Sequence, residues 1–228
     1  MPTLPKLDDT AARDRDFAHQ RALMVERHVA ARGIRDERVL QAMREVPRHR
    51  FVPPVVASKA YGPGALPIGA KQTISQPYIV ARMIELLELT GKEKVLEIGT
   101  GTGYQAVVLS KLCAKVFSIE RINELALVAS QLIRELKINN AAVKVFDGTY
   151  GWSDQAPFDR IIVAAAAPQI PDPLVQQLAR TGKMVIPIGA AGNPQRLARV
   201  SRVGTTVQIE DCGNAEFVPL VGRFGWKE

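Results

Sequence analysis

The stretch VLEIGTGTG at residues 95–103 decides the fold of this chain. An apolar segment typical of a buried strand runs directly into glycines at positions 99, 101 and 103, and helical sequence follows. Glycine permits positive φ angles and lets a ligand approach the backbone, because no Cβ stands in the way. The first turn of the next helix adds free N–H groups. We therefore expect a strand, a ligand-binding loop and a helix in succession.

Strand and helix patterns alternate from this loop onward. The predicted strands cover 94–98, 115–119, 142–146, 158–164 and 183–188, with helices at 104–112, 124–137 and 171–179 and β-rich stretches at 196–203, 207–210 and 217–221. Such alternation predicts an α/β fold with a doubly wound, mostly parallel Rossmann-like sheet that helices cover on both faces. In sheets of this kind, ligands bind at the carboxyl ends of the strands.

The segment before the glycine loop is predicted to be mainly helical. Residues 1–16 hold two prolines and many charges, so we expect a flexible arm there. The predicted helices cover 17–33, 36–46 and 77–91. The sequence YGPGALPIGAKQTISQP at 61–77 predicts a loop without regular structure, of a length that is usually functional. We expect one compact domain in which 17–90 carries the helices and this loop, and 91–228 carries the sheet.

Three acidic residues stand where successive predicted strands end. Glu97 would repel a phosphate and suits the cationic methionine part of S-adenosylmethionine. Glu120 has two acceptor oxygens for the two hydroxyls of a ribose. Asp147 can accept a hydrogen bond from the adenine amine, while Gly148 leaves room for the ring. Any one of these acids alone is also explained as a solvated strand end. Together with the glycine loop they predict S-adenosylmethionine as the cofactor.

Other nucleotide sites fit the glycine loop less well. A dinucleotide fingerprint is GxGxxG, whereas here the third glycine comes one position early and Tyr104 follows it. The loop lacks the Gly-Lys-Ser/Thr of a phosphate-binding P-loop. The two cysteines, Cys113 and Cys212, exclude a disulfide framework and a CxxC metal knuckle, and we expect free, buried thiols and no metal site.

Composition agrees with a globular enzyme. The 228 residues are 46% hydrophobic and 23% charged, with a net charge of +7, which permits a nucleic acid or an acidic partner without requiring one. The sequence has no leader pattern and no run of 18 apolar residues, so we expect a cytoplasmic protein without membrane contact. A monomer is the favoured state, although the sequence leaves the oligomeric state open.

Longer motifs add a specific resemblance. They are YGPGALPIGAKQTISQPYIVARMIELLEL at 61–89, VPRHRFVPP at 46–54, FDRIIVAAAAPQIPDPLVQQLARTGKMVIPIG at 158–189 and FVPLVGRFGW at 217–226. With the glycine loop, they resemble the protein-L-isoaspartate O-methyltransferase family. The resemblance implies transfer of a methyl group from S-adenosylmethionine to the free carboxylate of L-isoaspartyl residues in damaged proteins and peptides. It also implies a seven-stranded methyltransferase sheet with its last two strands exchanged and an N-terminal helical extension.

The resemblance also implies roles for individual residues. Ser75 corresponds to the family's active-site serine, and 218–220 to the segment that holds the substrate peptide. The expected cofactor-binding residues are Thr73, Glu97, Gly99, Gly101, Gly103, Glu120, Asp147 and Gly148. Because a carboxylate is already ionised at neutral pH, no general base is needed, and Ser75 would aim the carboxylate oxygen rather than attack. The three histidines, at 19, 28 and 49, are predicted to be surface or capping residues.

Two other functions remain open at this point. The same sheet supports methyltransferases that act on RNA or another nucleic acid, and the basic composition favours such a substrate. Against it, the chain has no Asn/Asp-Pro-Pro-Tyr motif and few aromatic residues near the strand ends for a flipped base. A cofactor-binding protein without catalysis is the second alternative, and the intact TISQP sequence argues against it. We expect no nucleic-acid partner.

Overall fold

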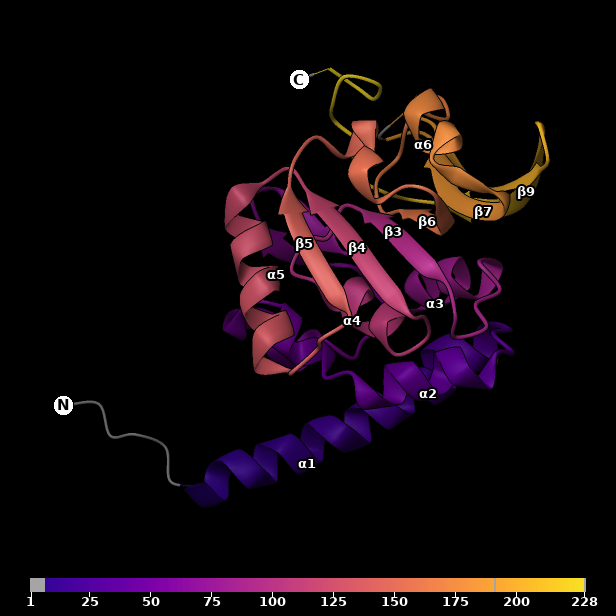
Figure 1. Cartoon of the computed structure of the whole chain (residues 1–228). Helices are drawn as coiled ribbons and strands as arrows, with labels where there is room; N and C mark the ends of the chain where they lie inside the picture. Colours follow the sequence, from indigo (N-terminus) through magenta and orange to yellow (C-terminus); the bar gives the residue numbers. More distant parts are fainter. Residues whose placement is uncertain (1–6, 191, 228) are drawn as a thin grey trace.

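The computed structural model describes residues 7–190 and 192–227. Its centre is a seven-stranded sheet in the order β5-β4-β3-β6-β7-β8-β9 (Figure 1). The strands are β3 (Lys94–Ile98), β4 (Lys115–Glu120), β5 (Ala141–Val145), β6 (Phe158–Val163), β7 (Leu178–Ile188), β8 (Gln195–Val203) and β9 (Thr206–Ala215). Strands β3 to β7 are parallel, whereas β8 and β9 are antiparallel to their neighbours. This confirms the predicted fold class, and β8 and β9 follow β7 in chain order, as the implied exchange requires.

Apolar side chains point alternately to the two faces of the sheet. Val95 packs into a cluster with the N-terminal helices, whereas Leu96 and Ile98 pack into a second cluster on the other face with Leu174. The helices of these layers are α3 (Pro77–Leu86), α4 (Tyr104–Ser110), α5 (Asn123–Glu135) and α6 (Asp172–Gln176). Burial on both faces explains why these strands are nearly continuous apolar runs.

Strand β7 begins earlier than expected, at Leu178 rather than at residue 183. The predicted helix over 171–179 is correspondingly short, because the Leu178 side chain is buried in the second cluster and its backbone is the β partner of Phe158. The register shifts between Phe158 and Arg160. The Thr181-Gly182 pair, which lies between the predicted helix and the predicted strand, is therefore part of the strand.

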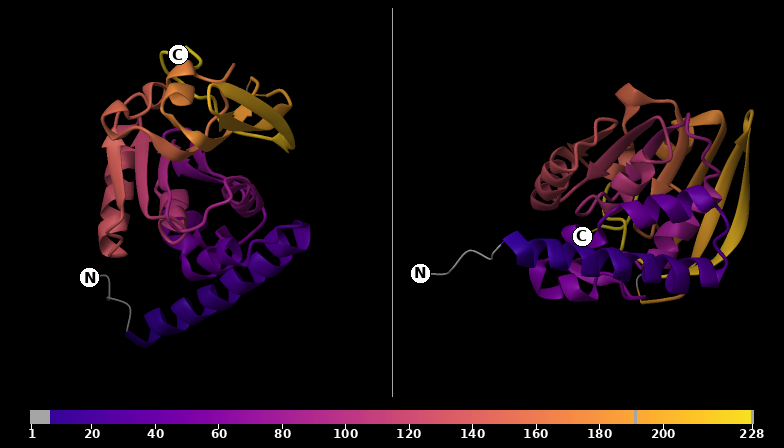
Figure 2. Two further views of the ribbon diagram at one scale, coloured as in Figure 1. Left: turned by 45° about the vertical axis from the view of Figure 1, so that its right-hand side comes forward. Right: turned by 90° about the horizontal axis from the view of Figure 1, so that it is seen from below.

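The N-terminal helices lie on the opposite side of the molecule from the C-terminal segment (Figure 2). They are α1 (Leu7–Met24), the π-helical turn η1 (Val25–Val29), the 3₁₀ turn η2 (Ala30–Arg32) and α2 (Glu37–Glu45). Asp36 caps α2 by accepting a hydrogen bond from the Arg38 backbone N–H. Helix α1 begins at Leu7 rather than Phe17, so residues 7–16 of the expected arm are helical, because its charged residues are compatible with a helix. Residues 1–6 of that arm lie outside the described residues.

The expected irregular loop at 61–77 contains a small β-hairpin. Strands β1 (Leu66–Gly69) and β2 (Gln72–Ile74) pair antiparallel across a two-residue turn. Both turn residues, Ala70 and Lys71, have positive φ angles of 49° and 57°. Hairpin turns of this kind favour glycine or asparagine, so alanine and lysine gave no signal in the sequence. The prediction of a loop without regular structure was wrong here.

Short 3₁₀ turns complete the chain. They are η3 (Arg48–Phe51), η4 (Pro54–Lys59), η5 (Gly148–Tyr150) and η6 (Ser153–Gln155). Both thiols are free, but Cys212 on β9 is partly exposed rather than buried, since β9 forms the edge of the sheet. Within residues 7–190 and 192–227, every helix is too short or too polar to cross a membrane.

Candidate functional site

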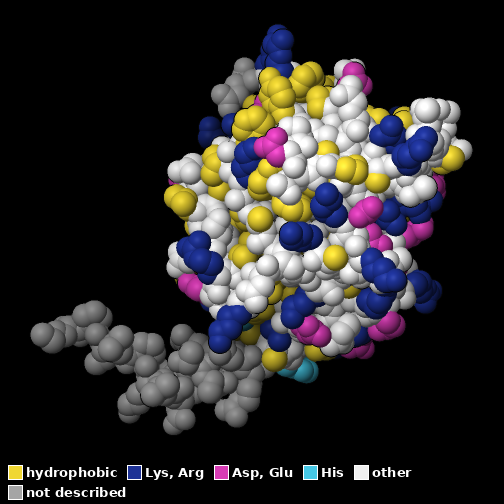
Figure 3. All heavy atoms as spheres, viewed as in Figure 1, with side chains coloured by type: hydrophobic (Ala, Val, Ile, Leu, Met, Phe, Trp, Pro, Cys, Tyr) yellow, Lys and Arg dark blue, Asp and Glu magenta, His cyan; other side chains and the backbone are white. Residues whose placement is uncertain are grey.

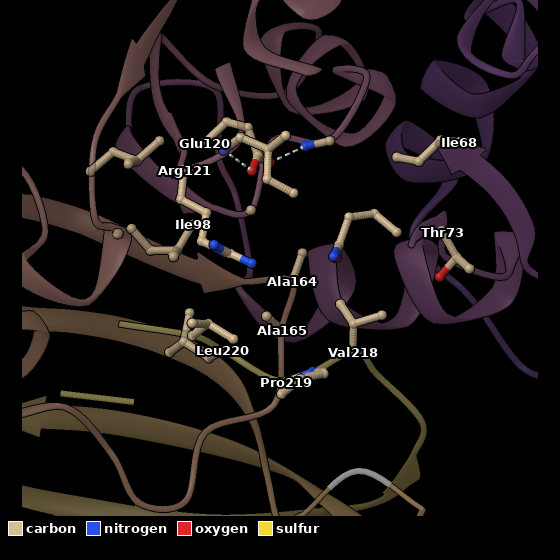
Figure 4. A pocket seen from close by; sticks show the side chains of 17 residues that line it. Ile68, Thr73, Ile98, Glu120, Arg121, Ala164, Ala165, Val218, Pro219 and Leu220 are labelled. Atoms are coloured by element: carbon tan, nitrogen blue, oxygen red, sulfur yellow. Dashed lines mark hydrogen bonds between the residues drawn. The ribbon is translucent and has the colours of Figure 1, made fainter. Parts of the chain in front are cut away.

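A cleft of about 560 Å³ opens at the carboxyl ends of the parallel strands (Figure 4). The ends of β3, β4 and β6 and the residue after Asp147 form its floor, which places the cleft at the point where the strand order reverses. In Figure 4, Glu120 lies on one side of the cleft and Val218, Pro219 and Leu220 lie on the other. Thr73 enters from the hairpin strand β2.

The glycine loop forms the rim of this cleft. Gly99 and Gly101 line it, with φ angles of 89° and 55°, and a Cβ on Gly101 would lie 3.0 Å from Ile68 Cδ1. Gly103 has a φ angle of 96° and caps α4, where a Cβ would lie 3.2 Å from the Ala129 Cβ. Gly103 is absent from the described lining of the cleft. The absence of a Cβ at Gly103 therefore allows α4 to pack closely against α5.

Glu120 is the acid that reaches the cleft. One carboxylate oxygen accepts a hydrogen bond from the Gly101 backbone N–H at 2.8 Å, and the other accepts one from the Ile122 N–H at 3.0 Å. These bonds tie the glycine loop to the end of β4. A carboxylate can accept about four hydrogen bonds, so both oxygens keep capacity for donors from a ligand.

Glu97, by contrast, does not reach the cleft. Its side chain is fully buried, and its carboxyl group is bound by the Gln105 amide at 3.0 Å and the Ser118 hydroxyl at 2.5 Å. Burial raises the pKa of Glu97 to about 7, and the hydrogen bonds from Ser118 and Gln105 only partly oppose this. Glu97 therefore points from β3 into the layer under α4, and its carboxyl group is not directed into the cleft.

Asp147 and Gly148 have different positions relative to the cleft. Gly148 lines it, and a Cβ there would overlap the Ile98 side chain. The Asp147 carboxylate accepts hydrogen bonds from the Thr149 backbone N–H and hydroxyl and from the Arg223 N–H. It lines a neighbouring surface hollow rather than the cleft. Asp147 thus caps η5 and holds the C-terminal loop, and the structure does not direct its carboxylate into the cleft.

Ser75 stands between two adjoining cavities. It lines a smaller cavity beside the glycine loop and also a broad groove of about 1530 Å³, and Thr73 lines both of these as well as the cleft. The groove continues along 214–219. Ala166 fixes this segment, because its N–H donates to the Val218 carbonyl and its carbonyl accepts from the Leu220 N–H, each at 2.8 Å.

Several residues that line the cleft were not predicted from the sequence. They are Ile68, Gln72, Ile98, Ile119, Arg121, Ile122, Ala164, Ala165 and Val221. The run of small residues after β6 was the available signal, since small side chains at the carboxyl end of a central strand leave room for a ligand. No pattern in the sequence indicated Ile68, because its position in the cleft depends on the hairpin turn between β1 and β2.

The histidines lie on the N-terminal elements. His19 is exposed and His28 is half-buried. The His49 ring stacks on Phe17 with centroids 4.1 Å apart, and its Nδ1 is 2.7 Å from the Tyr61 hydroxyl. His49 therefore joins α1 to the rest of the domain.

Comparison with known proteins identifies the family. Residues 19–225 match the model of the family described as protein-L-isoaspartate(D-aspartate) O-methyltransferase. The protein-L-isoaspartate O-methyltransferase of Geobacter metallireducens is 50% identical over 92% of this chain and 97% of its own length. A solved protein-L-isoaspartate O-methyltransferase structure has a TM-score of 0.80 at 25% identity, over 91% of this chain and 67% of its own.

A second solved structure supports the fold. It is a putative protein-L-isoaspartate O-methyltransferase from Plasmodium falciparum in complex with S-adenosyl-L-homocysteine, with a TM-score of 0.74 at 24% identity over 87% of this chain and 96% of its own. The resemblance stated from the motifs is confirmed by the family match and by the 50% identical relative. This chain belongs to the protein-L-isoaspartate(D-aspartate) O-methyltransferase family.

Proposed function

We propose that this protein is an S-adenosylmethionine-dependent enzyme that methylates the free carboxylate of L-isoaspartyl residues in damaged proteins and peptides. The observation that carries the proposal is the position of Ser75. It lines both the groove and the smaller cavity beside the glycine loop, and that cavity shares Thr73, Gly99 and Gly101 with the cleft. Membership of the family supplies the chemical identity of the two ligands.

The lining of the cleft fits the cofactor. Glu120 offers two carboxylate oxygens to ribose hydroxyls, and the apolar side chains of Ile98, Ile119 and Ile122 suit the faces of an adenine ring. Gly148 leaves the space that a side chain would fill. When bound, S-adenosylmethionine supplies an electrophilic methyl group on a sulfonium centre.

The residues of this chain have to align the substrate rather than activate it. The α-carboxylate of an isoaspartyl residue is ionised at neutral pH, so no base has to remove a proton. The Ser75 hydroxyl donates a hydrogen bond to one carboxylate oxygen and so directs the other toward the cleft. Holding two reactants in this way can provide several kcal/mol of the rate enhancement. The resulting methyl ester loses methanol to form a succinimide, which hydrolyses in part to normal aspartate.

The groove supports a peptide as the acceptor. By the family resemblance the 218–220 segment holds the substrate peptide, and its residues Val218 and Pro219 line the groove together with Thr73 and Ser75. We propose that isoaspartyl peptides lie against this segment with the damaged residue at Ser75. A flexible or locally unfolded region of a damaged protein can enter such an open groove.

Transfer of labelled methyl groups tests the proposal. An isoaspartyl peptide should yield base-labile label that is released as volatile methanol, whereas the same peptide with normal aspartate should yield none. Stable label on RNA would instead favour the nucleic-acid alternative, and no transfer to any acceptor would favour a binding protein.

The surface charge is relevant to the nucleic-acid alternative. Lys and Arg side chains on the face in Figure 3 are scattered among Asp and Glu side chains and form no continuous stripe.

Location and assembly belong to the same proposal. We propose a cytoplasmic location and a monomeric state for this enzyme. Cell fractionation and size-exclusion chromatography with light scattering test these two points.

A further inference from the structure

Arg48 in η3 is a fully buried cation directly behind the Ser75 loop. Its Nη2 donates to the Ser75 carbonyl at 2.7 Å, and its Nε donates to the Ala60 carbonyl at 2.9 Å. Its Nη1 is buried without a hydrogen-bond partner among the residues that the structure describes. Within the same described residues, no carboxylate lies within ion-pair distance of Arg48.

An unpaired buried charge is costly, which calls for an explanation. Burial lowers the pKa of Arg48, yet a guanidinium stays protonated in proteins. The guanidinium carbon lies 4.8 Å from the centroid of the Tyr104 ring, and this cation–π contact stabilises the cation without neutralising it. Burial raises the pKa of Tyr104 to about 12, so this phenol is neutral and supplies no opposite charge. The positive potential behind Ser75 is therefore not cancelled locally.

The same 3₁₀ turn also holds the glycine loop. The Phe51 carbonyl accepts a hydrogen bond from the Thr102 hydroxyl at 2.6 Å, and the Phe51 ring packs edge-on against Tyr104 with centroids 5.5 Å apart. Arg48 therefore holds the Ser75 loop, which lines the proposed substrate groove. Phe51 holds the glycine loop, which lines the proposed cofactor cleft, through the hydroxyl of Thr102. Turn η3 therefore fixes the distance between the two halves of the site.

We propose that Arg48 is a positioning residue that holds the Ser75 loop by its carbonyl, and that its unpaired charge makes the site select an ionised carboxylate beside Ser75. The inference rests on the proposed function and names what the site recognises: an anionic acceptor rather than a neutral one of the same shape. In a low-dielectric interior a cation acts strongly on a nearby anion. Arg48 exerts this attraction through the loop, without touching the substrate.

The test compares an isoaspartyl peptide with the same peptide carrying an α-carboxamide in place of the free carboxylate. Binding of each to the enzyme saturated with S-adenosylhomocysteine is measured by calorimetry. Wild type should bind the acid at least tenfold more tightly than the amide, and Arg48→Met should reduce this ratio to about one. Arg50→Met is the matched control, because Arg50 is an exposed neighbour in the same turn that pairs with Glu135.

The ratio distinguishes the proposal from a merely structural role, which would weaken both peptides equally. An unchanged ratio in folded Arg48→Met overturns the proposal. Should that variant not fold, Arg48→Lys is the deciding variant. It keeps the charge but loses the fixed, planar pair of donors that binds the two carbonyls, so the ratio should persist while kcat falls about tenfold. Loss of the ratio or an unchanged kcat in Arg48→Lys overturns the proposal. Failure of wild type to methylate the isoaspartyl peptide would instead refute the proposed function itself.

Discussion

Replacement of Glu97 by glutamine should change how stability depends on pH. The pKa of Glu97 rises from its ordinary 4.5 to about 7 in the folded protein, chiefly because the side chain is fully buried. Below pH 4.5 the group is protonated in both states. Between pH 4.5 and about 7 the unfolded chain releases this proton and the folded protein keeps it, so the contribution to stability is lost as the pH rises.

The size of the effect follows from the two pKa values. One pH unit corresponds to about 1.4 kcal/mol, so the rise to about 7 amounts to about 3 kcal/mol. Glu97→Gln has no such titration. Its new amide can donate to Ser118 Oγ while its oxygen accepts from Gln105, because Ser118 can turn its own proton to Thr100 Oγ1, which is 2.5 Å away.

Urea unfolding of both proteins at pH 4.5, 5.5, 6.5 and 7.5 measures the difference. Relative to wild type, the free energy of unfolding of Glu97→Gln should rise by about 3 kcal/mol across this range. Parallel pH dependences for the two proteins would refute the reasoning. Glu93→Gln is the control of opposite sign. Burial raises the pKa of Glu93, but hydrogen bonds from Thr90 and from the backbone N–H of Gly91 outweigh this and lower it. The stabilisation from Glu93 is present above about pH 4.5 and is lost as the pH falls further. Glu93→Gln should therefore be less stable than wild type at pH 5.5, 6.5 and 7.5, by an amount that does not grow with pH.

Three further changes test the site. Ser75→Ala should lower kcat for an isoaspartyl peptide by about 10- to 100-fold, which is the value of a hydrogen bond to a charged group. Its affinity for S-adenosylhomocysteine should stay within twofold of wild type. Equal turnover by Ser75→Ala and wild type would contradict the role of Ser75. Glu120→Gln should weaken S-adenosylhomocysteine binding by about 10- to 100-fold in calorimetry, and unchanged affinity counts against a ribose contact. Gly148→Ala should lower the free energy of unfolding, measured in urea, by about 1–3 kcal/mol because the new Cβ would overlap the Ile98 side chain. Gly204→Ala is the control, because a Cβ at Gly204 meets open space and the φ angle of 64° leaves backbone strain as the only cost.

Patterns within single segments predicted the sheet well. The strand at 94–98 was predicted with the boundaries that β3 has, because an apolar run followed by glycines leaves little choice of structure. The hairpin in the Ser75 loop and the early start of β7 were missed. Both depend on tertiary contacts: the hairpin holds Ala70 and Lys71 at positive φ angles, and Leu178 is drawn into β7 by Phe158. Local propensity says little about either.

The sequence by itself determined the alternation of strands and helices from the glycine loop onward, the glycine loop itself and the family. It also placed three acids near strand ends, but it could not say which of them faces the cleft. Side chains alternate along a strand, and both faces of this sheet are covered, so burial gives no preferred side. Tertiary structure decided that Glu120 reaches the cleft, whereas Glu97 is enclosed under α4 and Asp147 caps a turn. It likewise brought Arg48 behind Ser75, because a contact across 27 residues of sequence depends on how the elements pack.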